Sequence, residues 1–375
     1  MPLVVAGIDE AGYGPMLGPL VVARAVLRVE RWLPGEPAPD FWQLLTPAVT
    51  DRPSDPRRRI PVADSKKLKL SNDTPDPLIH LRRGVAAMLA QLPGVRPGHI
   101  ADDDALLTAL GVGELPQAWY APVEPDGTPP TSSATTGSAT ASSATASSAT
   151  TGSATDWAST PSSHLRGIDA NMLAGALTDA GVQALELRVR VIDEAEFNDT
   201  LRQHATKAAT TALALGEHLR HLWAQFANDG DGPRVVCDRQ GGRQAYGDEL
   251  YNMLPTVRDA GLAKAGGVTM LEETPQRSRY LCEVLDPPVQ RGRLSAVFQT
   301  EGESAHLPIA LASMAAKLTR ELLMKRFNAY WRARAQLSGV ALKPTAGYVQ
   351  DARRWLTDAK PLLTPDDRTN LVRRA

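Results

Sequence analysis

The chain has 375 residues, 43% of them hydrophobic, with a mean hydropathy of −0.23 and a formal net charge of −1. These values are typical of a soluble globular protein with one large or two ordinary domains. The net charge is too close to zero for the chain as a whole to attract nucleic acid by its charge alone. Any phosphate-binding surface must therefore be local. No stretch approaches the ~20 apolar residues of a membrane helix, so we expect no membrane partner.

The cysteine content and the first residues set expectations about the cellular setting. Cys237 and Cys282 are too few for a disulfide framework or a cysteine-rich zinc site. The apolar opening, residues 1–8, is short, has no basic leading segment and runs straight into acids, which is not typical of a signal peptide. We expect a cytoplasmic protein, and we expect a monomer.

A tract rich in serine, alanine and threonine interrupts the sequence at residues 127–163, where an irregular Ser-Ala-Thr repeat has neither helical nor strand periodicity. Such a composition has too little apolar surface to offset the entropy that is lost on ordering. We predict that this tract is a disordered insertion in a main domain at residues 1–335. A C-terminal helical region would follow at residues 336–375.

Apolar periodicity predicts a mixture of strands and helices along the rest of the chain. Short apolar runs or apolar–polar alternation indicate strands at residues 2–8, 18–29, 184–192, 234–237, 268–271 and 294–299. Helical spacing predicts helices at residues 77–92, 196–226 and 308–327, each as a single helix. Only a few residues join the first two strands, so part of the sheet must be antiparallel. The mixture predicts an α/β fold.

Two adjacent acids, Asp9 and Glu10, follow the first predicted strand. The end of a strand directs such a pair to opposite sides, and hard divalent cations such as Mg²⁺ bind several carboxylate oxygens. The alternative is an ordinary solvated loop. The glycines that follow also loosely match a dinucleotide-binding loop, although Pro15 and Pro19 stand where the phosphate-binding helix would begin.

Two later acids also have ordinary alternatives. Asp238 ends a predicted strand and precedes the basic glycine loop 239–243, so it could simply begin a turn. Glu303 could be a helix N-terminal acid that the helix dipole favours.

Histidine spacing suggests a different kind of metal site. Glu303 with His306, and His218 with His221, have the spacing of helical metal ligands. A carboxylate-bridged di-iron bundle would need two Glu-x-x-His pairs, and the sequence has one. We therefore interpret His306 as a helix residue near the acids, and the other two histidines as an exposed pair.

A basic stretch at residues 317–334 carries six lysines and arginines against one acid, Glu321. It is either a phosphate-binding surface or a solvated basic face of a helix.

Several motifs, taken together and in order, resemble those of the ribonuclease HII family. Residues 7–15, Gly-Ile-Asp-Glu-Ala-Gly-Tyr-Gly-Pro, resemble the family's opening motif together with residues 18–22. Residues 64–68, Asp-Ser-Lys-Lys-Leu, match the second motif letter for letter. One such motif is a modest indication, whereas the ordered set is a strong one.

The remaining motifs follow in the family's order. Residues 196–198, Glu-Phe-Asn, resemble the segment that precedes the third acid, which would be Asp238. Glu303, followed by a helix at 312–320, resembles the last acid. Residues 347–348 resemble the C-terminal Gly-Tyr motif. The resemblance leaves out, as insertions, residues 30–60, 95–180 and 250–290.

The resemblance implies a ribonuclease H-like fold, with a mixed sheet, helices on both faces and an appended C-terminal helical region; residues 1–335 would be the catalytic domain. It implies hydrolysis of the RNA strand of an RNA–DNA hybrid, or of a duplex with embedded ribonucleotides, with two divalent ions, Mg²⁺ or Mn²⁺. The catalytic acids and metal ligands would be Asp9, Glu10, Asp238 and Glu303. The substrate-binding residues would be Gly12, Tyr13, Gly14, Ser65, Lys66, Lys67 and Tyr348.

The physical chemistry of phosphodiester hydrolysis is consistent with these acids. Charge builds up on the phosphoryl oxygens and on the leaving 3′ oxygen, and two cations ~3.5–4 Å apart can activate water and stabilise that oxygen. Three or four carboxylates are needed to hold two such ions together. Lys66 and Lys67 would bind backbone phosphates. The alternative is that both are ordinary solvated lysines. Tyr348 would pack on a sugar, or is a half-buried core tyrosine.

The sequence departs from the family at three places. Tyr13 stands between Gly12 and Gly14 where the family has a cation, which bears on the choice between hybrids and single embedded ribonucleotides. Glu303 replaces an aspartate and is longer by one methylene. The basic glycine loop 239–243 follows the third acid.

Three functions are compatible with the sequence, in descending order. The first is an active two-metal nuclease on RNA–DNA hybrids. The second is a nucleic-acid-binding module on the same fold that has lost catalysis. The third is a nucleotide-dependent enzyme built on the glycine-rich loop.

Overall fold

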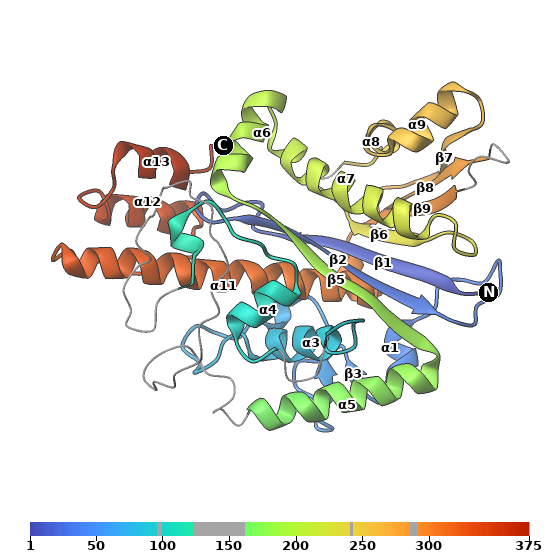
Figure 1. Ribbon diagram of the computed structural model, residues 1–375, viewed down its shortest axis with the longest axis horizontal. Coiled ribbons are helices and arrows are strands. Elements are labelled where there is room, and N and C mark those ends of the chain that lie inside the picture. Colours follow the sequence, from blue (N-terminus) through green and yellow to red (C-terminus); the bar gives the residue numbers. More distant parts are fainter. Residues whose placement is uncertain (96–99, 123–161, 241–242, 286–291, 375) are drawn as a thin grey trace, which may run out of the picture.

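The computed structural model describes residues 1–95, 100–122, 162–240, 243–285 and 292–374 (Figure 1). Its strands are β1 Leu3–Ala11, β2 Leu20–Val29, β3 Val49–Thr50, β4 Ile60–Pro61, β5 Val182–Ile192, β6 Arg234–Asp238, β7 Gly266–Glu273, β8 Arg277–Val284 and β9 Gly292–Gln299. Within the described residues, seven of them form one sheet in the order β5-β2-β1-β6-β9-β8-β7, and β3 and β4 pair separately.

The large sheet is mixed. β1, β6 and β9 are parallel neighbours at its centre, whereas β2 and β5 on one side and β8 and β7 on the other are antiparallel to their neighbours. The antiparallel pairing of β1 with β2 was predicted and is confirmed. Because the three central strands run in one direction, their carboxyl ends lie at the same edge of the sheet.

Helices cover both faces of the sheet (Figure 1). On one face α11 Leu307–Leu337 packs against β1, β2 and β5, with α3 Ile79–Leu89 and α5 Ser162–Ala180 outside it. On the other face α7 Lys207–Phe226 packs on β1, β2 and β9, beside α8 Gly247–Met253 and α9 Pro255–Leu262. The other helices are α1 Phe41–Leu44, α2 Ser65–Leu68, α4 Asp103–Ala109, the 3₁₀ helix η1 Ala118–Tyr120, α6 Glu194–His204, α10 Gly302–Ala305, α12 Val349–Asp358 and α13 Pro365–Leu371.

Strand alternation divides the core into two apolar clusters, one on each face. Leu3 and Val5 of β1 belong to the cluster under α11, whereas Val4, Ala6 and Ile8 belong to the cluster under α7. Successive side chains of a strand point to opposite faces, so a strand that is apolar throughout requires cover on both. The predicted fold class, a mixed α/β sheet with helices on both faces and a C-terminal helical region, is confirmed.

The prediction of a single helix at residues 196–226 is wrong. α6 ends at His204, and Ala205 adopts a left-handed conformation with φ of 60°. Thr206 then caps α7, because its side chain accepts a hydrogen bond from the Ala209 amide. Apolar periodicity did not reveal the break, since it does not record the backbone conformation of a single alanine such as Ala205.

Several elements were not predicted, among them β8 and α5. β8 lies inside residues 250–290, which the sequence indicated as an insertion, yet it pairs with both β9 and β7. α5 begins at Ser162, and the rest of the predicted disordered tract, residues 127–161, lies outside the described residues. α11 continues to Leu337, so the predicted boundary at residue 335 falls in its last turn. None of the described helices has the combination of length and apolar character needed to cross a bilayer.

The start of α11 lies unusually close to β1. A Cβ atom on Gly7 would lie 2.2 Å from the Ile309 amide nitrogen and 2.2 Å from the Pro308 carbonyl carbon. Only a glycine allows the backbone of the helix to approach the strand that closely. This contact fixes α11 next to the strand that carries Asp9 and Glu10.

Replacing Gly7 by alanine is therefore expected to destabilise the protein. Gly7→Ala should lower the free energy of unfolding by at least about 1–3 kcal/mol, because the backbone atoms that the methyl group meets cannot move aside cheaply. Gly175→Ala is the matched control: no heavy atom lies within 4 Å of a Cβ there. Since Gly175 is exposed inside α5, its replacement should stabilise the protein by about 0.5–1 kcal/mol. Urea denaturation measures both, and equal effects would contradict the close approach.

Candidate active site

The four predicted acids lie at the carboxyl edge of the three parallel strands. Asp9 and Glu10 are near the end of β1, and Asp238 is the last residue of β6, where the pairing of Ile8 with Cys237 makes the two strand ends neighbours. Asp238 pairs in turn with Gln299 of β9, and Glu303 follows on α10. Ligand sites of open α/β sheets lie at this edge.

The Asp9 carboxylate is anchored inside the protein. Its side chain faces α11, is only 9% exposed, and accepts a hydrogen bond of 2.7 Å from the Glu10 amide. Ser313 of α11 also hydrogen-bonds to this carboxylate, and its Oγ lies 3.0 Å from Oγ of Ser65. Ser65 is buried, so its hydroxyl supports Asp9 through Ser313 from within the protein.

Burial and neighbouring negative charges raise the pKa values of Asp9, Glu10 and Asp238. Burial, followed by the charges of Glu10 and Asp238, raises the pKa of Asp9 well above its usual range. Burial and the charge of Asp238 raise the pKa of Glu10 to about 7, against the opposing effect of Lys66. The pKa of Asp238 rises to about 6 through burial and the charge of Glu303. The four acids thus form a continuous series of repelling neighbours.

The donor set suits a hard divalent cation. Carboxylate oxygens are the ligands that Mg²⁺ and Mn²⁺ prefer, and a cation would relieve the repulsion that raises these pKa values. Oε2 of Glu303 is buried without a hydrogen-bond partner, which is costly unless something else satisfies it. Within the described part of the chain, no three Asp, Glu, His or Cys side chains already form a closed metal-binding group. Cation binding would therefore require these side chains to draw closer.

The lysines of the second motif stand beside the acids. Asp64 caps the short helix α2 by accepting a hydrogen bond of 2.9 Å from the Lys66 amide. Lys66 and Lys67 are both exposed. The ammonium group of Lys66 lowers the pKa values of Glu10 and Asp238, which places it near the acids.

The glycine-rich loop joins β1 to β2 and contains no helix. A dinucleotide site needs a helix N-terminus at this loop, so that alternative is wrong. Gly12 has a φ of 93°, and a Cβ there would lie 2.6 Å from Nε of Arg320. Gly14 faces open space, and Tyr13 is 39% exposed. The loop is therefore accessible at its tip and tightly packed at its base.

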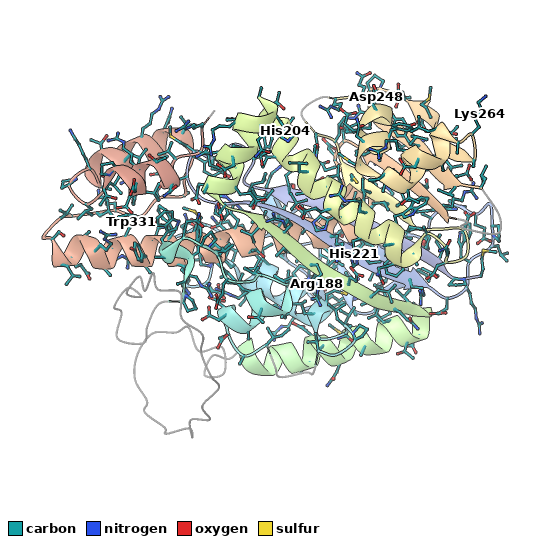
Figure 2. All side chains as sticks on the ribbon, turned by 45° about the horizontal axis from the view of Figure 1, so that its top comes forward. Arg188, His204, His221, Asp248, Lys264 and Trp331 are labelled. Carbon is teal, nitrogen blue, oxygen red and sulfur yellow. The ribbon has the colours of Figure 1, made fainter. Side chains whose placement is uncertain are left out.

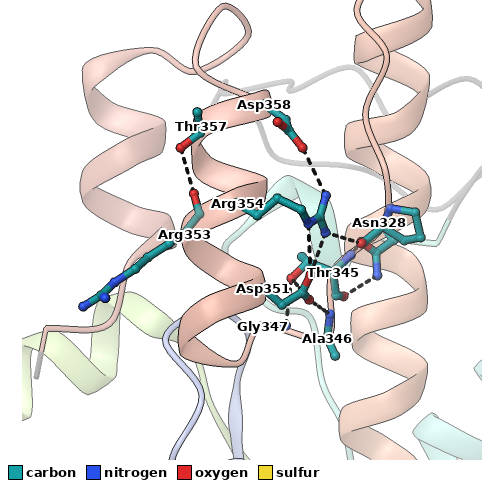
Figure 3. Close-up of polar contacts among 10 residues, drawn as sticks. Asn328, Thr345, Ala346, Gly347, Asp351, Arg353, Arg354, Thr357 and Asp358 are labelled. Atoms are coloured by element: carbon teal, nitrogen blue, oxygen red, sulfur yellow. Dashed lines mark hydrogen bonds and ion pairs between the residues drawn. The ribbon is translucent and has the colours of Figure 1, made fainter.

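Tyr348 lies at the start of α12 and is 53% exposed, so the alternative of a core tyrosine is wrong. The segment before it is held by a polar network (Figure 3). Asn328 of α11 exchanges two hydrogen bonds with the Thr345 backbone, of 2.8 and 2.9 Å. Asp351 accepts hydrogen bonds from the Thr345 hydroxyl and the Ala346 amide, of 2.6 and 2.8 Å.

The basic stretch 317–334 is largely committed to contacts within the protein. Lys317 pairs with Glu321, while Lys325 and Arg326 pair with Asp103 and Asp104. The predicted phosphate-binding surface there has little free charge to offer.

The histidine pair on α7 is not exposed as predicted. His218 is buried, with Nδ1 2.8 Å from a nitrogen of Arg24 and Nε2 3.2 Å from the Val22 carbonyl oxygen. His221, labelled in Figure 2, is half-buried and pairs with Glu186. These histidines stabilise the contact between α7 and the sheet, and a layered sheet excludes a di-iron helical bundle.

Sequence reasoning missed the residues that support the site from a distance. Ser313 was not among the predicted site residues, although it supports Asp9. Arg320 was counted as a surface cation, yet it is buried and donates to the carbonyl oxygens of Leu17 and Ala346. Arg373 had no sequence signal at all.

Comparisons with known proteins match the chain to solved structures alone, since no family model and no curated protein matches it. Ribonuclease H2 from Pyrococcus horikoshii is 12% identical, with 99% of this chain and 93% of that chain covered and a TM-score of 0.36. Ribonuclease HII of Archaeoglobus fulgidus, from a complex with PCNA, is 12% identical, with 98% and 93% covered and a TM-score of 0.37. Bst-RNase HIII in complex with Mn²⁺ is 12% identical, with 99% and 66% covered and a TM-score of 0.35.

The three structures are a ribonuclease H2, a ribonuclease HII and a ribonuclease HIII. Identities this low, with TM-scores below 0.5, say nothing about catalytic residues. The fold class rests on the strand order and helix layers of the chain itself.

The raised pKa of Glu10 predicts a stability that depends on pH. Because the folded-state pKa is about 7 and the ordinary value is 4.5, the folded protein loses stability as pH rises between these values. In metal-free protein, Glu10→Gln should raise the free energy of unfolding at pH 8 by on the order of 1–3 kcal/mol and change it little at pH 5.

Glu321→Gln is the control of opposite sign. Although burial alone would raise it, the pKa of Glu321 is lowered by Lys317 and Lys69. Its neutralisation should therefore destabilise the protein at pH 8. Chemical denaturation in the presence of a chelator measures both variants. A Glu10→Gln protein that is less stable at pH 8 would show that the acids do not repel one another.

Proposed function

We propose that the protein is a metal-dependent endoribonuclease that hydrolyses the RNA strand of RNA–DNA hybrids, as the ribonuclease HII family does. One observation carries this proposal: three parallel strands bring four acids, each of which repels at least one of the others, to one edge of the sheet. An uncompensated cluster of this kind costs stability, and such a cost is typical of sites that are kept for chemistry. The exposed lysines and the glycine-rich loop beside the acids support a nucleic-acid substrate.

The acids would hold two divalent ions, Mg²⁺ or Mn²⁺, through Asp9, Glu10, Asp238 and Glu303. When bound, these ions activate water and stabilise the leaving 3′ oxygen. The protein's own residues position the acids. Ser313 and the Glu10 amide orient the Asp9 carboxylate, and the amides of Arg239 and Gly302 hydrogen-bond to Asp238.

Substrate contacts would come from the exposed residues around the acids. Lys66 and Lys67 would bind backbone phosphates, with Lys66 nearer the scissile bond. The glycine-rich loop, Gly12 to Gly14, would approach the 2′-hydroxyl through its backbone. Tyr348 would pack on a sugar, and Ser65 would contribute through Ser313 and Asp9.

A binding module without catalysis is the second candidate. A binding module is compatible with the fold and the exposed lysines. It does not explain why acids are buried next to the surface that would bind the phosphates. Four carboxylates repel phosphates unless cations intervene, so their cost favours the nuclease.

The nuclease predicts cleavage that needs both metal and acids. With Mg²⁺ or Mn²⁺, the protein should cut the RNA strand of a hybrid and leave a 3′-hydroxyl. Asp9→Asn or Asp238→Asn should reduce the rate at least about a hundredfold, because loss of a direct ligand costs more than loss of a supporting contact. Asp248→Asn, an exposed acid on α8 (Figure 2), should have no effect. Gel electrophoresis of end-labelled hybrids measures the rates.

Salt-dependent binding of hybrid without any cleavage under either metal would support the binding module and overturn the nuclease. Equal loss of rate in the Asp248 variant would also contradict the assignment of the acids.

The two lysines predict a graded effect on substrate binding. Lys66→Met should raise KM about threefold to tenfold and reduce the slope of binding against salt concentration by about 1, as expected for one lost phosphate contact. Lys67→Met makes the same change one residue further along α2 and should have a smaller effect, because Lys66 is the lysine whose charge acts on Glu10 and Asp238. Titration of each variant with hybrid at several salt concentrations measures the slope of binding affinity against salt concentration. Equal slopes for Lys66→Met and Lys67→Met would contradict the predicted difference between the two lysines.

A further inference from the structure

The glycine-rich loop is held from beneath by a residue close to the C-terminal end of the sequence. Nη2 of Arg373 donates a hydrogen bond of 2.6 Å to the Gly12 carbonyl oxygen and another to the Pro15 carbonyl oxygen. The Arg373 amide also donates to the Met16 carbonyl oxygen, at 2.9 Å. The Arg373 side chain is buried, at 3% exposure, so it contacts the loop from inside the protein.

α6 fixes this residue in place. Nδ2 of Asn198 donates to the Val372 carbonyl oxygen at 2.9 Å, and the Arg374 amide donates to Oδ1 of Asn198 at 2.7 Å. The Arg373 guanidinium also lies 4.6 Å from the ring centroid of Phe197. Through Phe197 and Asn198, the Glu-Phe-Asn motif at 196–198 thus holds the segment Val372–Arg374, which we call the strap. Figure 1 shows the C-terminus beside α6.

Other segments complete the support of the loop base. The Gly347 carbonyl oxygen accepts hydrogen bonds from the Met16 and Leu17 amides, at 2.8 and 3.1 Å. Oε1 of Glu194 accepts one from the Gly18 amide at 3.0 Å. Among the hydrogen bonds of the described residues, those from Arg373 hold the carbonyl oxygens of Gly12 and Pro15, which flank the exposed tip.

A loop with two glycines has high conformational freedom unless its backbone groups are held. Recognition through backbone groups needs those groups to be fixed before the substrate arrives, because ordering them on binding would weaken affinity. In the family that the motifs resemble, a cation occupies the loop at the position of Tyr13. This chain instead places a guanidinium beneath the loop.

We propose that Arg373 is a positioning residue: the strap fixes the Gly12-Tyr13-Gly14 loop and thereby sets the affinity for a ribonucleotide-containing duplex. The effect on affinity rests on the proposed nuclease function, whereas the effect on the loop does not. Arg373 acts through the carbonyl oxygens of the loop and does not touch the substrate.

Hydrogen exchange of the loop amides tests the strap without any substrate. In metal-free Arg373→Gln, the amides of residues 16–18 should exchange about tenfold faster or more, the change expected when hydrogen bonds from a charged donor are lost. Arg373→Lys, which keeps the charge, should restore part of the protection. Arg368→Gln is the control, because it removes one exposed positive charge from nearby α13. Thermal unfolding of each variant separates a loosened loop from a protein that has not folded.

Hybrid cleavage tests the effect on affinity. Arg373→Gln should raise KM about fivefold or more and leave kcat nearly unchanged, since the acids are intact. Asn198→Ala should act through the same contacts, so the double variant should be little worse than either single one.

The proposed role of the strap would be wrong if the loop amides of Arg373→Gln exchanged at the wild-type rate. It would also be wrong if they exchanged as fast in Arg368→Gln as in Arg373→Gln. Faster exchange with an unchanged KM would overturn its effect on affinity. If the wild-type protein cleaves no hybrid, the proposed nuclease function fails, together with the effect on affinity, while the exchange data still decide whether the strap holds the loop.

Discussion

The parallel register of β1, β6 and β9 is the constraint on which the site depends. It brings Asp9, Glu10 and Asp238 to one edge of the sheet, where burial and mutual repulsion raise all three pKa values. The fold must offset this cost elsewhere. The apolar clusters on both faces of the sheet supply the stabilisation, and the close approach of α11 at Gly7 brings the Ser313 hydroxyl to the Asp9 carboxylate.

The acids and the glycine-rich loop are supported in different ways. The acids lie at the ends of central strands, so the sheet itself fixes their backbone. The loop lies between two strands and depends on contacts from residues far away in the sequence, including Gly347 and Arg373. Under the proposed function, an acid edge whose backbone the sheet fixes and a separately held loop would allow substrate affinity to change while the chemistry remains intact. The C-terminal helical region thus completes the site as well as the fold.

Much of this arrangement could be predicted from the sequence, because the signals were local. Short apolar runs at β1 and β2, and acids directly after such runs, identified the strands and the candidate acids. The break at Ala205, the strand β8 and the buried state of Arg320 could not be predicted, since each depends on tertiary packing. The contacts of Arg373 with Gly12 and Pro15 join residues more than 350 positions apart, and no periodicity records such a contact.

Glu303 shows how the backbone can accommodate a longer acid. An aspartate and a glutamate differ by one methylene, so the carboxylate of a glutamate reaches the same point only if its backbone lies further back. Glu301, just before α10, adopts a left-handed conformation with φ of 53°, and the amide of Gly302 hydrogen-bonds to Asp238. A Cβ on Gly302 would lie 2.6 Å from Cδ1 of Ile309, so α10 packs tightly against α11. The turn is therefore fixed at both ends, which leaves the Glu303 side chain, with its unpartnered Oε2, as the part of the site free to move toward a cation.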